Sequence, residues 1–132
     1  MESKNILPFI ITGMVVIGLA PADVSAHGWM APKHEATQRD PRPAVHQSME
    51  SGQALFAEFC AQCHGADGLG LPATTTQLDS DTPNLPQRLS SHSDGDFHWK
   101  IRTGRGEMPA FEEDLSADEI WDIIHFIHSQ PN

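Results

Sequence analysis

The residues of this sequence with the clearest chemical potential are two cysteines and a histidine in one short segment, Cys60-Ala-Gln-Cys63-His64. Cysteines three positions apart at the end of a helix lie on one side of that helix. In the pattern Cys-x-x-Cys-His, two thiols add across the vinyl groups of a haem and the adjacent imidazole binds its iron. We therefore expect one covalently attached haem c at Cys60 and Cys63, with His64 as an iron ligand.

Other interpretations of this cysteine pair are less well supported by the sequence. A structural disulfide is the ordinary expectation for a cysteine pair in an exported protein, but it gives no role to His64. A redox dithiol is expected within a βαβ pattern, which the sequence lacks. A structural zinc site needs two further Cys or His ligands at short spacing. Haem attachment is therefore favoured over these alternatives.

A helix must carry this segment, and the residues before it have a helical pattern. Ser48 is a candidate N-cap, Glu50 lies in the first turn, and apolar residues share one face up to Phe59. We expect the folded domain to begin near Ser48 and this helix to run directly into Cys60. Residues 65–93, by contrast, are rich in Gly, Pro, Thr and Ser, which predicts a long loop wrapped around a group that is not protein.

Two further helices are predicted downstream. One is capped by Ser93 or Asp94 and stops at Gly104. The other opens with a capping box from Ser116 to Glu119 and carries an apolar stripe of Ile120, Ile123, Ile124 and Ile127. The sequence has no strand pattern, so we predict an all-α domain over residues 48–132. Core burial alone is marginal for a domain of this size, and a large apolar cofactor would complete it.

The N-terminal segments have a different composition. Lys4, the apolar run 6–20 and the small residues 24–26 predict a signal peptide over residues 1–26 and hence a periplasmic or otherwise exported protein. The run is shorter than the roughly 20 residues that cross a bilayer, although an uncleaved signal would act as an N-terminal membrane anchor. Residues 27–47 contain three prolines and no sustained apolar period, which predicts an extended N-terminal arm.

The charge balance excludes one class of partner. The chain has 8 basic and 18 acidic residues and a formal net charge of -10. Nucleic-acid binding depends on clustered Lys and Arg, so we expect no nucleic-acid partner. An acidic exported protein suits a basic docking partner, and peripheral contact with a membrane is compatible with the sequence.

Beyond the Cys-x-x-Cys-His motif, the sequence resembles the class I cytochrome c family over about residues 48–131. The matching features run in order along the chain: Gly52 and Phe56 before Cys60, the haem motif with Gly65, Gly68-x-Gly70, Ile101-Arg-Thr-Gly104, Gly106-Glu-Met-Pro109, and the terminal helix with Trp121 and Phe126. The resemblance implies a small cytochrome c fold, with helices wrapped around one covalent haem. It also implies that the terminal helix packs across the helix that leads into the haem motif.

The resemblance further implies a second iron ligand, Met108. This residue lies 44 positions after His64, enough chain to reach the other haem face, and is followed by the rigid Pro109. Met30, Met49 or another histidine are the alternatives. The resemblance also suggests that the Pro72 carbonyl accepts a hydrogen bond from His64, and Arg102 and Arg105 are candidates to pair with the haem propionates.

These features predict an electron-transfer protein rather than an enzyme. Iron bound by His64 and Met108 has no open position for a substrate and changes oxidation state with little rearrangement. The expected partners are redox proteins, such as a membrane-bound oxidase or dehydrogenase. The alternative is a haem enzyme or gas sensor, in which the sixth iron position is open or Met108 is easily displaced.

Overall fold

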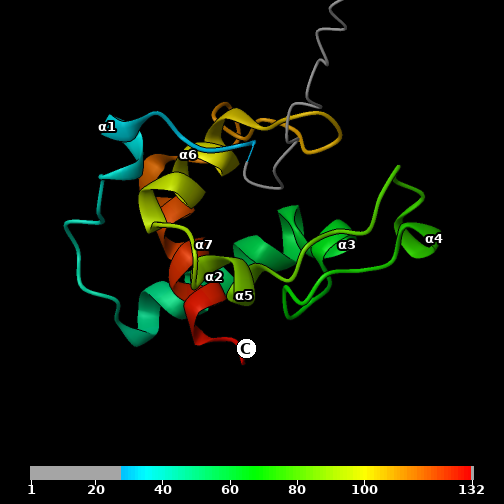
Figure 1. The fold of residues 1–132 in the computed structure, drawn as a ribbon. Coiled ribbons are helices and arrows are strands. Elements are labelled where there is room, and N and C mark those ends of the chain that lie inside the picture. The colour runs from blue at the N-terminus through cyan, green and yellow to red at the C-terminus, as the bar shows by residue number, and fades with distance from the viewer. Residues whose placement is uncertain (1–27, 132) are drawn as a thin grey trace, which may run out of the picture.

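A computed structural model describes residues 28–131 of the chain. The predicted signal peptide, residues 1–26, lies outside the described residues. The described part is helical: α1 (Lys33–Ala36), α2 (His46–Phe59), α3 (Ala61–His64), α4 (Ala73–Thr76), α5 (Leu85–Leu89), α6 (Asp94–Thr103) and α7 (Ala117–Ser129) (Figure 1). Within it no strand forms, and no helix is long and apolar enough to cross a membrane. The all-α prediction is confirmed.

The fold is organised by the crossing of α2 and α7, which pack together more extensively than any other pair of described helices (Figure 1). At the crossing Gly52 has no room for a side chain, because a Cβ there would lie 1.9 Å from the backbone oxygen of Asp122. One turn later, the buried Phe56 ring packs against Phe126 with their centroids 5.2 Å apart. This crossing fixes the end of α2, and therefore the haem motif, against the core.

We expect Gly52→Ala to lower the free energy of unfolding by about 3 kcal/mol, the upper end of the usual cost of overpacking. The added methyl group can be accommodated only if α2 and α7 move apart. Denaturant titration of the haem-loaded protein measures this change. Gln53→Ala, at the exposed next position of α2, is the control and should stay within about 0.5 kcal/mol of the parent. Equal stabilities for the two variants would contradict the close crossing.

The two downstream helices form where the sequence predicts them. In α6 the Ser93 side chain accepts a hydrogen bond from the Asp96 N–H, and the helix ends at Gly104, whose φ is 60°. In α7 the Ser116 and Glu119 side chains form the predicted reciprocal capping box. Its apolar stripe is buried and supplies the centre of the core, which comprises Phe56, Leu89, Phe97, Ile101, Phe111, Leu115, Ile120, Trp121, Ile123, Ile124, Phe126 and Ile127.

Three local predictions are wrong. The helix predicted to start at Ser48 begins at His46, and the Ser48 hydroxyl bonds back to the carbonyl of Val45 at 2.8 Å from inside the first turn. The predicted loop over residues 65–93 contains α4 and α5, the latter capped by Asn84. Within the predicted extended arm, residues 33–36 form the single turn α1.

Candidate functional site

The Cys-x-x-Cys-His motif occupies one helical turn that is offset from α2. Cys60 interrupts the helix with φ -118° and ψ -36°, and α3 follows immediately. The N–H groups of Cys63 and His64 both donate to the Cys60 carbonyl, at 3.1 and 2.9 Å. Gly65, with φ 78°, ends α3 directly after His64. The two thiols, which are not joined in a disulfide, are thereby held on the same turn as the imidazole.

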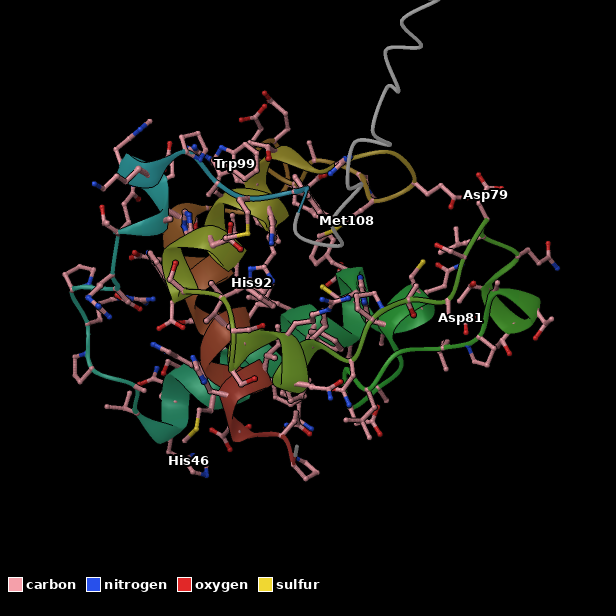
Figure 2. The ribbon with its side chains drawn as sticks, in the orientation of Figure 1. His46, Asp79, Asp81, His92, Trp99 and Met108 are labelled. Carbon is pink, nitrogen blue, oxygen red and sulfur yellow. The ribbon has the colours of Figure 1, made fainter. Side chains whose placement is uncertain are left out.

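This turn forms one wall of a cavity of about 560 Å³, within the range of about 300–1,000 Å³ that is typical of cofactor sites. Cys63 and His64 line it from α3, Cys60 lines it from the N-cap of that helix, and Met108 lines it from the loop after α6. The remaining apolar wall comes from Phe56, Phe59, Leu78, Leu85, Phe97, Ile101, Phe111, Ile123 and Ile127. In Figure 2, Met108 lies on the loop that follows α6, above the start of α3.

The loop that carries Met108 is tightly folded. Arg105 and Met108 exchange two backbone hydrogen bonds, at 2.8 and 3.1 Å. At Gly104 a Cβ would lie 2.4 Å from the carbonyl carbon of Pro109, so the chain passes close to itself. Met108 is therefore held in the cavity wall by a closed backbone turn.

Among the alternatives to Met108, two methionines do not line the cavity. Met30 is 48% exposed, and neither Met30 nor Met49 lines the cavity. His92 does line it, but its Nδ1 lies 2.9 Å from the buried carboxylate of Asp96. Of the methionines within residues 28–131, Met108 is the one that lines the cavity together with the haem motif.

Burial sets the protonation of the motif. Burial lowers the pKa of His64, which favours the neutral imidazole that binds metals. Its Nδ1 is buried and has no hydrogen-bond partner among the described residues. Burial, together with the charge of Cys63, raises the pKa of the Cys60 thiol to about 12. At neutral pH both groups are therefore uncharged.

The expected hydrogen bond from His64 to Pro72 is not formed. The Pro72 carbonyl accepts instead from the backbone N–H groups of Thr75 and Thr76, at 2.9 and 3.2 Å, and so begins α4. Pro72 does not line the cavity, whereas Pro83 does. Pro83, directly before the N-cap of α5, was not among the site residues predicted from the sequence.

The composition of the cavity fits a haem, which is a broad apolar ring that carries two carboxylates. The thiols and the imidazole stand on one wall, a thioether on another, and aromatic and aliphatic side chains between them. Arg88, Lys100 and Arg105 supply cations at the cavity. Arg102 does not, because its guanidinium pairs with Glu35 at 2.8 Å outside the cavity. Of the two arginines expected to pair with the propionates, only Arg105 lines the cavity.

The chain matches a known protein family across most of the helical domain. Residues 47–127 match the family described as cytochrome c oxidase, cbb3-type, subunit III. The matched region includes Cys60, Cys63, His64 and Met108, and it leaves residues 28–46 outside.

Individual relatives agree with this match. Cytochrome c6 of Bumilleriopsis filiformis is 29% identical over 83 residues, which are 62% of this chain and 91% of the relative. Cytochrome c6 of Picosynechococcus sp. is 30% identical over 95 residues, covering 67% of this chain and 78% of the relative. The cbb3-type cytochrome c oxidase subunit FixP of Rhizobium meliloti is 29% identical over 90 residues, which are 66% of this chain but 29% of that longer protein.

Proposed function

The chain belongs to the cytochrome family of cbb3-type oxidase subunit III and is an electron-transfer protein with one covalent haem c, and from this premise we propose which residues hold the haem. Cys60 and Cys63 form its thioether links, and His64 and Met108 bind its iron. The supporting observation is the cavity that His64 lines from α3 and Met108 lines from the loop after α6. When bound there, the haem supplies an iron atom that alternates between the ferrous and ferric states.

Each residue then has a defined task. The two thioether links fix the cofactor to α3, which Gly65 and the crossing of α2 with α7 hold in place. Neutral His64 donates a ring nitrogen to the iron, and the thioether of Met108 favours the ferrous state and raises the reduction potential. The apolar wall excludes water. With His64 and Met108 both bound to the iron, no position would be left for a substrate, and the protein would act as a carrier rather than an enzyme.

Two measurements on the exported protein test this assignment. Its intact mass should equal that of the polypeptide plus one haem. Addition of CO to the reduced protein should leave the absorption spectrum unchanged, because Met108 already fills the sixth position. Rapid CO binding would contradict the carrier assignment and favour the haem enzyme or gas sensor.

The location and the partners follow from the same proposal. Haem attachment to Cys60 and Cys63, together with the N-terminal apolar segment, supports export to the periplasm or an equivalent compartment. The partners are redox proteins. The name of the similar FixP protein, a subunit of a cbb3-type oxidase, supports a membrane-bound oxidase as the electron acceptor.

The partner is proposed to carry a basic docking surface, because acidic side chains stand at the cavity. Asp81 and Glu107 line it and are exposed. The Glu107 carboxylate accepts a hydrogen bond at 3.0 Å from the backbone N–H of Asp79, and Figure 2 shows Asp79 and Asp81 on the loop that follows α4. These three carboxylates come from two loops that meet beside Met108. A cationic partner that approaches this edge is attracted by all three.

Bimolecular electron transfer with a cationic partner is therefore expected to slow as salt is added, since the Debye length falls to about 8 Å at physiological ionic strength. Glu107→Gln should lower the rate at low salt and flatten its salt dependence. Glu58→Gln removes the same charge from an exposed position on α2 that does not line the cavity, and it should have a smaller effect. Stopped-flow measurements at several ionic strengths compare the two. Identical effects would mean that only the net charge matters.

A further inference from the structure

The arm before α2 is docked against α6, although it lies outside the region matched by the cytochrome family. At Gly95 a Cβ would lie 2.3 Å from the backbone oxygen of Glu35, so the arm passes directly over this glycine. The Ser93 hydroxyl donates to the carbonyl of Ala36 at 2.6 Å. The Glu35 carboxylate pairs with Arg102 at 2.8 Å. Backbone contact and charge pairing together fix the position of the arm.

A single buried carboxylate joins the arm to the cavity wall. Asp96 is 0% exposed and accepts a hydrogen bond from the backbone N–H of Ala31 at 2.6 Å. Its other oxygen lies 2.6 Å from Nζ of Lys100 and 2.9 Å from Nδ1 of His92. Both Lys100 and His92 line the cavity. Asp96 thus binds the arm and two cavity residues at one point, as a buried carboxylate must be paired to be tolerated.

Two residues before Ala31, the arm itself enters the cavity wall. Trp29 is half-buried and lines the cavity. Nζ of Lys100 lies 5.5 Å from the centroid of the Trp29 ring, and the guanidinium carbon of Arg105 lies 5.9 Å from it. Both distances are within the range of cation–π attraction. The indole therefore lies close to two cations that also line the cavity.

We propose that Trp29 is a haem-binding residue, which the arm adds to the cavity from outside the common cytochrome domain. This inference rests on the proposed haem site and extends it. A ferric haem carries one more positive charge than a ferrous haem, and water stabilises the more highly charged form. An apolar ring that keeps water out of this wall favours the ferrous form. Trp29 therefore raises the reduction potential, and Asp96 is the positioning residue that keeps the arm in place.

The test is a spectroelectrochemical titration of the haem-loaded, exported full-length protein. We expect Trp29→Ala to have a lower reduction potential than the parent, because water reaches the emptied wall. Trp29→Gln keeps much of the side-chain volume but is polar, and its potential should also fall. Trp29→Phe, which remains apolar and aromatic, should stay close to the parent. Intact mass and the visible spectrum verify that each variant carries covalent haem with unchanged iron ligands.

Two controls separate this effect from general destabilisation. Trp99→Ala removes the same side chain from α6 at a position that does not line the cavity, and Met30→Ala alters the exposed neighbour of Trp29. Both should keep the potential of the parent. Equal potentials in Trp29→Ala, Trp29→Gln and the parent, with covalent haem present, would overturn the inference and leave the proposed function intact. Absence of covalent haem from the parent itself would instead refute the proposed function.

Discussion

Replacement of both Cys60 and Cys63 by serine is expected to yield an exported protein without covalent haem. Serine has nearly the same shape as cysteine, but its hydroxyl does not add to the haem vinyl groups. The intact mass should therefore equal that of the polypeptide alone, and extraction with acidified acetone should remove all colour from the protein. Retention of haem in the polypeptide fraction would contradict attachment at this motif.

The same variant should also lose most of its folded stability. The cavity is lined by side chains that form the inner surface of α2, α6 and α7, including Phe56, Phe97 and Ile123. Without a permanently attached cofactor these apolar groups face water or an empty space, and a domain of this size has little other core to compensate. Thermal unfolding followed by circular dichroism measures the loss. Gln62→Ala, which alters a position between the two cysteines, is the control and should keep both haem and stability.

The parts of the fold that could be predicted from the sequence are those whose signals are local. The capping box of Ser116 and Glu119, and the stop at Gly104, each depend on residues within one turn of a helix end. The haem motif is equally local, since Cys60, Cys63 and His64 share one turn. In each case the residues that act together are neighbours in sequence, so their spacing predicts the local structure.

The start of α2 shows how a local signal can be misassigned. Ser48 suggests an N-cap, but its hydroxyl bonds to Val45 from the third position of the helix. A serine side chain can bond to the backbone from either the N-cap or the third helical position, and the sequence does not distinguish between the two. The short helix α5 is not predicted from the sequence, for a different reason. Asn84 caps it and Pro86 lies in its first turn, but these signals stand within a segment whose overall composition is that of a loop.

The remaining features could not be predicted because they depend on the path of the chain in three dimensions. Whether Pro72 or Pro83 reaches the cavity is decided by how the loop folds around α4. The arm is the clearest example: Ala31 and Asp96, which bind each other, are 65 positions apart in sequence. No periodicity or spacing indicates that Trp29 reaches the cavity. The proline-rich composition predicts an extended arm, but it carries no information about docking.

The largest spectroscopic change is expected at Met108. Replacement by histidine substitutes an imidazole, a stronger electron donor than a thioether, and so stabilises the ferric state. We expect a clearly lower reduction potential and the loss of the absorption band that arises from charge transfer between sulfur and iron. Met108→Ala removes the side chain altogether. It should open the sixth iron position, permit CO binding to the reduced protein and produce weak peroxidase activity that the parent lacks.

The controls for this prediction follow from the geometry of the loop and the cavity. Met30→Ala and Met49→Ala change methionines that do not line the cavity, so both variants should keep the potential and the spectrum of the parent. Met108, by contrast, is held in the wall by its two backbone hydrogen bonds with Arg105, and among residues 28–131 no other methionine lines the cavity. If Met108→Ala retained both the potential and the charge-transfer band, Met108 would not be a ligand. His92, which also lines the cavity, would then be the next candidate for the sixth iron ligand. Its replacement would test whether its imidazole fills that position.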